Sequence, residues 1–123
     1  MTIDKLIEFC IALPAVTEHF PFDEDTLVLK VGAKMFVLTS LSNWEAGTPS
    51  VNLKCDPDRA EELRAEYEDI IPGYHMSKKH WNTVSINKQV PDAMVRELIV
   101  DSYNLVFTSL TKKAQAEISN LSN

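Results

Sequence analysis

The chain is poor in the residues that mark several common protein classes. Three glycines and six prolines among 123 residues exclude a collagen-like or low-complexity chain. A chain of this length needs no disulfide staples, and we expect Cys10 and Cys55 to be reduced and buried in a cytoplasmic protein. No apolar run approaches the ~18 residues of a membrane span, and the first residues lack a signal-peptide pattern. We therefore expect one globular domain over residues 1–123, fraying at its last few residues.

Basic residues are also in deficit. Twelve Lys and Arg stand against 18 Asp and Glu, so the net charge is −6, which counts against a domain built mainly to coat nucleic acid. The charge is unevenly distributed, because segments 17–25 and 56–69 carry −4 and −5 whereas segments 26–55 and 70–90 carry +2 and +3. The basic strands and turns can therefore present cations to phosphates despite the overall sign.

The periodicity of apolar residues predicts an α+β fold in two layers, with an antiparallel sheet and helices packed on one of its faces. The expected elements are, in chain order, a helix over 2–13 capped by Thr2, strands over 26–31, 35–41 and 50–55, a helix over 56–67 that begins at Asp56-Pro57, a strand over 81–87, a long helix from Pro91 and a last helix capped by Thr111. We expect loops over 15–24 and 42–49, and an irregular segment over 69–76 with a short strand at its start.

The first two strands are predicted to form a hairpin. Leu27, Leu29 and Val31 alternate with more polar residues, and Gly32-Ala33 supplies the turn. In the second strand, Met35, Val37, Thr39 and Leu41 alternate with other residues in the same way.

The segment 78–80, Lys-Lys-His, is the first candidate site. It follows a Pro-Gly loop and lies between the aromatic residues Tyr74 and Trp81. Cations interleaved with aromatics can pair with phosphates while the rings stack on bases. The alternative is that both rings pack the domain and the lysines keep a strand end soluble, which we favour for Trp81. Trp44, in a polar loop, is the better candidate for an exposed stacking ring.

Catalytic and metal-binding motifs give weaker signals. His75 and His80 are five residues apart, and no CxxC or HExxH motif is present, so zinc has no local signature. Cys55 precedes a helix N-terminus, where a thiolate is stabilised, but its alternation with Val51 and Leu53 indicates a core side chain. We expect no catalysis, no cofactor and no bound metal.

The segment from Pro72 to Val84, PGYHMSKKHWNTV, resembles the YjbR/MmcQ family of small bacterial proteins, whose signature reads like H-x-N-K-x-H-W. Ser77 stands where the family usually has Asn, a small polar exchange. The resemblance covers nearly the whole chain and includes three further stretches: Leu13-Pro14 leading to Phe20-Pro21-Phe22, the strand over 51–57, and Asp101-Ser102-Tyr103.

The resemblance implies a compact fold similar to CyaY (frataxin) and to secretion chaperones, in the order α-β(3)-α-β(2)-α. The family is commonly labelled DNA-binding because its sheet resembles the double-wing motif of a phage transcription factor, which is an argument from fold. Carried over residue by residue, the signature implies a functional cluster of four residues: His75, Lys78, His80 and Trp81.

Together these observations predict a monomeric cytoplasmic protein that binds DNA. In this hypothesis the phosphates are contacted by Lys30, Lys34, Lys78 and Lys79, and the surface is shaped by His75, His80 and Trp81. The alternative is a protein-interaction or chaperone-like module that uses an exposed sheet face and Trp44. A third possibility is a metal-binding surface formed by the carboxylates of segment 56–69. A contiguous basic patch, an exposed apolar patch and crowded carboxylates, respectively, would distinguish the three.

Overall fold

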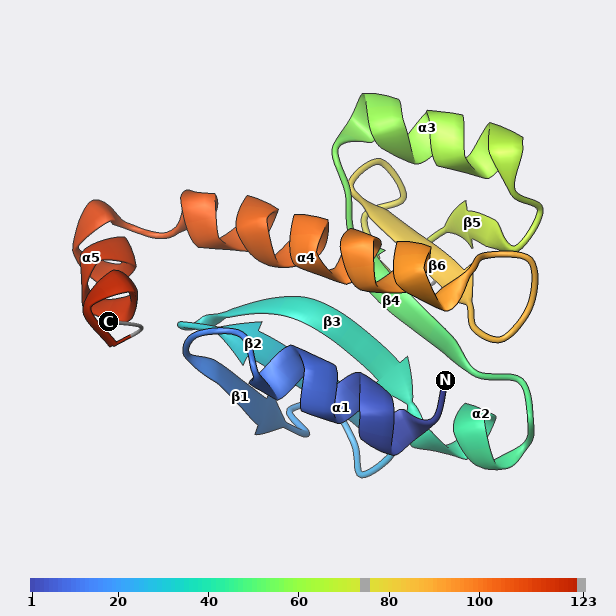
Figure 1. Ribbon diagram of the computed structural model, residues 1–123, viewed down its shortest axis with the longest axis horizontal. Helices are drawn as coiled ribbons and strands as arrows, with labels where there is room; N and C mark the ends of the chain where they lie inside the picture. Colours follow the sequence, from blue (N-terminus) through green and yellow to red (C-terminus); the bar gives the residue numbers. More distant parts are fainter. Residues whose placement is uncertain (74–75, 122–123) are drawn as a thin grey trace.

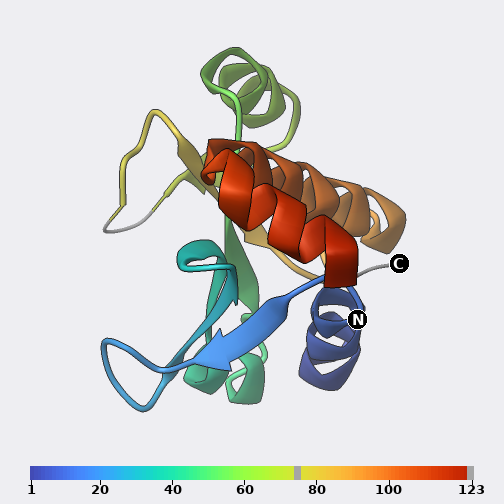
Figure 2. The ribbon, with the colours of Figure 1, turned by 90° about the vertical axis from the view of Figure 1, so that its left-hand side faces the viewer.

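The computed structural model describes residues 1–73 and 76–121, except for the side chain of Leu121 (Figure 1). Its elements are, in chain order, α1 (Ile3–Ile11), β1 (Val16–His19), β2 (Thr26–Val31), β3 (Lys34–Ser40), α2 (Leu41–Glu45), β4 (Ser50–Lys54), α3 (Pro57–Glu66), β5 (Ile70–Pro72), β6 (Trp81–Ser85), α4 (Asp92–Ser109) and α5 (Lys112–Leu121). The strands form one antiparallel sheet in the order β1-β2-β3-β4-β6-β5. Helices α1, α4 and α5 lie on the same side of this sheet (Figure 2), which confirms the α+β class.

Three of the helices begin at the caps that the sequence predicts. The hydroxyl of Thr2 accepts a hydrogen bond from the backbone of Lys5, at 3.2 Å. Asp56 caps α3, which has Pro57 in its first turn, and the hydroxyl of Thr111 accepts from Ala114 at 3.1 Å. These side chains satisfy backbone N–H groups that have no partner within the helix, so each start is encoded locally.

Helix α4 supplies the centre of the core. Its buried residues lie on one face at the helical spacing: Val95, Leu98, Ile99, Ser102, Tyr103 and Val106. Across from them, Phe36 of β3 meets Tyr103 edge to face, with ring centroids 5.4 Å apart. No helix within residues 1–73 and 76–121 has the length and hydropathy that crossing a membrane requires.

Two segments expected to be loops contain regular structure. Val16 to His19 form β1, which pairs with β2 along the edge of the sheet. Three of its four residues are exposed, so the strand lacks the apolar alternation that would identify it in the sequence. Residues 41–45 form α2, capped by the hydroxyl of Ser40. Both elements depend on contacts outside their own residues: β1 pairs with β2, and the backbone N–H of Ser42 in α2 donates to Asp25.

A register shift in the β2–β3 hairpin interrupts the predicted alternation of β3. Leu29 lies opposite Val37, but Lys30 lies opposite Met35, so Phe36 is an extra residue in β3. Phe36 and Val37 are both fully buried on the helical side. Met35 packs instead with a small cluster on the other face, so the predicted alternation, which puts Met35 on the same face as Val37, is wrong at this position.

Ser102 of α4 bridges β3 and β4 where their pairing ends. Its hydroxyl donates to the carbonyl of Phe36 at 2.6 Å and accepts from the backbone N–H of Lys54 at 2.9 Å. We expect Ser102→Ala to lower the free energy of unfolding by about 2 kcal/mol, because it leaves these backbone groups without their partner. Urea denaturation measures this loss. Asn104→Ala, at an exposed position of the same helix, should change stability by less than about 0.5 kcal/mol, and equal losses in the two variants would contradict the bridging role.

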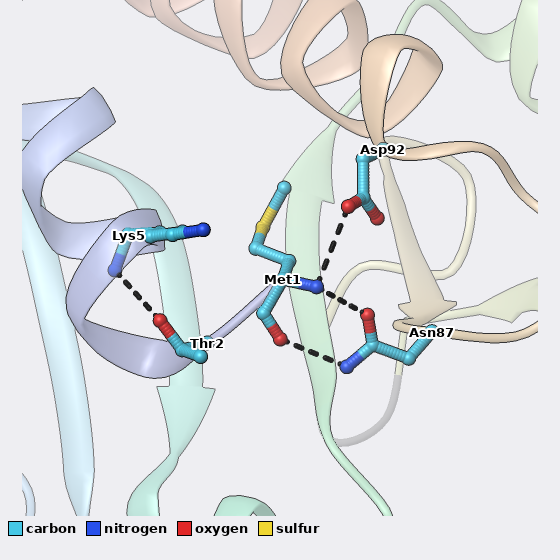
Figure 3. Close-up of polar contacts among 5 residues, drawn as sticks. All are labelled: Met1, Thr2, Lys5, Asn87 and Asp92. Atoms are coloured by element: carbon cyan, nitrogen blue, oxygen red, sulfur yellow. Dashed lines mark hydrogen bonds and ion pairs between the residues drawn. The ribbon is translucent and has the colours of Figure 1, made fainter.

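The first residue is held against the turn that precedes α4 (Figure 3). The Met1 ammonium donates to Oδ1 of Asn87 at 2.6 Å and lies 3.3 Å from Oδ2 of Asp92. Asn87 returns a hydrogen bond from Nδ2 to the Met1 carbonyl, at 2.8 Å, and adopts a left-handed backbone with φ of 62°. These contacts join the start of α1 to the start of α4.

Candidate functional site

The sheet face opposite α1 and α4, here called the open face, is the main candidate site. The segments around residues 20–25 and 76–80 both project beyond the sheet on this side (Figure 2). Between them lies a hollow of about 800 Å³. Its lining consists of Phe22, Asp25, Thr26, Met35, Leu38, Thr39, Ser40, Asn43, Ser50, Asn52, Met76, Ser77, Trp81 and Thr83.

Strand alternation explains the chemistry of this hollow. In β4, Val51 and Leu53 are buried toward the helices, so the alternate residues Ser50, Asn52 and Lys54 are on the open face. Asn52 lies opposite both Leu38 and Thr83 in the strand register, in the middle of the lined region. Most of the lining side chains are neutral hydroxyls and amides, and the others are largely apolar.

Cations gather at one end of the open face. Lys30 lies opposite Met35 across β2 and β3, and Lys54 lies opposite Trp81 across β4 and β6. The Ser102 bridge between Phe36 and Lys54 shows that these ends of β3 and β4 are adjacent. The exposed residues of the segment before β6 complete the group. We call this group the basic end; it comprises Lys30, Lys54, Lys78, Lys79 and His80.

The opposite end of the hollow is acidic. The segment between β1 and β2 carries Asp23, Glu24 and Asp25, which we call the acidic end. The Ser40 hydroxyl donates to Asp25 at 2.6 Å and the backbone N–H of Ser42 donates at 2.8 Å, and these bonds lower the pKa of Asp25. Asp23 accepts from the backbone of residues 26 and 25, which lowers its pKa as well. Both carboxylates are therefore ionised at neutral pH.

The structure brings together only part of the predicted site. Lys30 and the segment 78–80 share the basic end, but Lys34 is directed elsewhere. Its ammonium donates to the carbonyl and the hydroxyl of Ser109 at the end of α4, each at 3.3 Å. Trp81 is only 8% exposed and packs in a small cluster, so little of its side chain is accessible at the hollow that it helps to line. His75 and Tyr74 lie outside the described residues.

Arg64 of α3, which sequence reasoning treated only as part of an acidic helix, braces the basic end. Its Nε donates to Oδ1 of Asn82 at 2.6 Å. Its Nη2 donates to the carbonyl of Trp81 at 3.2 Å and to that of Lys78. One planar guanidinium therefore holds the segment that carries the exposed lysines. In the sequence, the signal that could have identified Arg64 was a cation within a run of acids. Lys54 was also missed, and its signal was the alternation with the buried residues Val51 and Leu53 of β4.

The exposed aromatic residues are not the expected ones. Trp44 is half-buried, and its Nε1 donates to the hydroxyl of Thr39 at 2.8 Å, so the prediction that it is an exposed stacking ring is wrong. Phe20 and Phe22 are 49% and 64% exposed instead. Phe22 lines the hollow, which places an accessible ring beside the acidic end.

The nucleophile and metal alternatives receive no support from the geometry. Both cysteines are free and buried, as predicted. Desolvation raises the pKa of Cys10 to about 12 and raises the pKa of Cys55 as well, which disfavours the reactive thiolate. Within the described part of the chain, no three His, Cys, Asp or Glu side chains form a group that could hold a metal ion. The acidic side chains of α3, Asp58, Glu61, Glu62 and Glu66, are all exposed.

Similar proteins extend across most of the chain. The uncharacterized protein YbdF of Escherichia coli O157:H7 is 41% identical over 86% of this chain and 84% of its own length. The uncharacterized protein YjbR of Escherichia coli K12 is 32% identical over 84% and 85%, respectively. Among solved structures, the DUF419-domain protein DR2400 of Deinococcus radiodurans is 41% identical, with a TM-score of 0.87 over 96% of this chain and 88% of its own.

A second solved structure and a family model also match most of the chain. A Pseudomonas syringae protein matches with a TM-score of 0.73 at 25% identity, over 86% of this chain and 99% of its own. The family model described as YjbR matches residues 11–105, which include the open face and its two projecting segments. This chain therefore belongs to the YjbR family.

Proposed function

We propose that the protein binds nucleic acid through the basic end of the open face, without catalysing a reaction on it. The observation that supports this proposal is the convergence of four lysines and His80, from three separate parts of the chain, on one end of one sheet face. Lysines so arranged contact successive phosphates and release counterions, which is the main source of affinity in sequence-independent binding. The double-wing resemblance points to the same class of ligand, but only by analogy of fold.

The acidic end restricts how a nucleic acid can lie on this face. A phosphate chain that followed the strands would pass from the basic end to the ionised carboxylates of Asp23 and Asp25. A chain that crosses the strands at the basic end avoids this repulsion. We therefore propose a short contact of about three phosphates, and a correspondingly weak affinity at physiological salt.

The salt dependence of binding tests this proposal. With about three phosphate contacts, the affinity for labelled DNA should fall roughly 40-fold between about 50 and 200 mM salt, from a slope of ~0.9 per contact. Fluorescence anisotropy at several salt concentrations measures the slope directly. An affinity that does not change with salt, or no binding at about 50 mM, would contradict the proposal.

A protein partner is the second candidate, and the exposed rings of Phe20 and Phe22 favour it. Exposed aromatic side chains beside a hollow are typical of protein-binding surfaces. This candidate predicts little salt dependence and no loss of binding on charge reversal at the basic end. Failure to bind any oligonucleotide would make it the leading hypothesis.

A further inference from the structure

We infer that the hollow of the open face receives an unpaired nucleobase, so that the protein prefers single-stranded to duplex nucleic acid. This inference rests on the proposed function, because the basic end holds the phosphates of the same strand. The hollow, at about 800 Å³, falls within the ~300–1,000 Å³ of typical small-ligand pockets.

The chemistry of the lining matches a base better than it matches a phosphate. Among the described residues, no lysine lines the hollow and Asp25 is the one charged side chain; it is already hydrogen-bonded to Ser40 and Ser42. The remaining groups are hydroxyls, amides and apolar side chains. A nucleobase is a neutral ring with apolar faces and with donors and acceptors around its edge, so it complements both kinds of surface.

Asn52 is placed to contact the edge of such a base. It lies between Leu38 and Thr83 in the middle of the hollow, and its Oδ1 accepts a hydrogen bond from the hydroxyl of Thr83. This bond orients the amide, and side-chain amides are well suited to pairing with base edges. Met35 and Met76, half-buried at the same surface, offer adaptable contacts for the ring faces.

Phe22 supplies a stacking ring at the rim. It lines the hollow and is 64% exposed, whereas Phe20 is exposed to a similar degree but does not line it. The two phenylalanines therefore provide a matched pair for experiment. Alanine at position 22 removes a ring from the hollow, and alanine at position 20 removes an equally large ring that does not line it.

The two charged ends orient the nucleotide. Phosphates are attracted to the basic end and repelled from the acidic end, so the base is the part that extends over the hollow. In a duplex the bases are stacked and paired, and one enters a pocket only if it is flipped out at a cost of a few kcal/mol. A single strand avoids this cost, which is the physical origin of the expected preference.

Three labelled probes of about 12 nucleotides test the inference by fluorescence anisotropy at about 50 mM salt: a single DNA strand, an abasic strand of the same length, and a duplex. We expect the base-bearing single strand to bind about tenfold more tightly than either other probe, since stacking one base on an aromatic ring contributes ~1–3 kcal/mol. The abasic strand keeps the phosphates, so it isolates the contribution of the base without any change to the protein.

Two substitutions locate the effect in the hollow. Phe22→Ala should reduce single-strand affinity about fivefold to tenfold, and Phe20→Ala should leave it nearly unchanged. Asn52→Trp fills the hollow and should reduce single-strand affinity to the level of the abasic probe while the salt slope persists. Circular dichroism checks that each variant is folded.

Equal affinity for the base-bearing and abasic strands would overturn the inference while leaving the proposed function intact. Equal losses in Phe22→Ala and Phe20→Ala would overturn it too, because the contact would then lie outside the hollow. If the protein binds none of the three probes, the proposed function fails, and this inference fails with it.

Discussion

Replacing Lys78 and Lys79 together by glutamate is expected to weaken DNA binding roughly 100-fold at about 50 mM salt, because two phosphate contacts become two repulsions. Both side chains are exposed. Lys78 contacts Arg64 through its backbone carbonyl rather than its ammonium, so the substitution leaves that contact in place. Anisotropy titrations of Lys78→Glu/Lys79→Glu against the unmodified protein measure the change.

The matched control reverses the same number of charges on the other side of the molecule. Lys112 and Lys113 are exposed at the start of α5, which lies on the helical side of the sheet (Figure 2). Lys112→Glu/Lys113→Glu therefore reproduces the change in net charge without touching the basic end, and should weaken binding less than about threefold. Equal losses in both double variants would show that binding depends on overall charge alone.

Arg64→Ala is expected to lower the free energy of unfolding by about 3 kcal/mol, which would be a large effect for a single substitution. The guanidinium donates to Asn82 and to two backbone carbonyls, and hydrogen bonds from charged groups contribute ~1.5–3 kcal/mol each when well placed. Asn82 is 2% exposed, and its Nδ2 has no hydrogen-bond partner among the described residues. Loss of the bond to Oδ1 would leave the whole amide buried and unpaired. Urea denaturation measures this loss of stability, and thermal unfolding should show a Tm that is lower by about 10 °C.

Two further variants separate this bracing role from the charge of the helix. Arg59→Ala removes an exposed cation of α3 whose contact with Asp101 is 4.0 Å long, and should cost less than about 0.5 kcal/mol. Arg64→Lys keeps the charge but lacks the planar fork, so it should recover little of the lost stability. Full recovery by lysine, or an equal loss in Arg59→Ala, would show that charge rather than geometry matters here.

Arg64 should also affect ligand binding, because it holds the segment that bears Lys78 and Lys79. At a temperature where Arg64→Ala is fully folded, we expect about tenfold weaker DNA binding with an unchanged salt slope. The lysines would still reach phosphates, but ordering their segment would then cost conformational entropy on binding. Such a pattern marks Arg64 as a positioning residue rather than a phosphate contact.

Local chemistry explains which parts of the fold were predictable. The caps at Thr2, Asp56 and Thr111 satisfy backbone groups within three residues, so their signals are contained in short stretches of sequence. The buried face of α4 repeats with the helical period, and the turn at Gly32 needs a left-handed backbone, with φ of 60°. The signature around residues 72–84 likewise predicted the family.

The sequence by itself therefore determined the α+β class, most helix starts, the β2–β3 hairpin and the family. Only the tertiary structure decided the edge strand β1, the extra residue at Phe36 and the partners of Lys34, Trp44 and Arg64. The partners of Lys34 and Arg64 lie 75 and 14 to 18 residues away in the chain, whereas Trp44 bonds to Thr39, five residues before it. No periodicity of the sequence encodes any of these contacts. The same holds for the candidate site: strand register, which packing sets, brings Lys30 and Lys54 to the end of the face that carries Lys78 and Lys79.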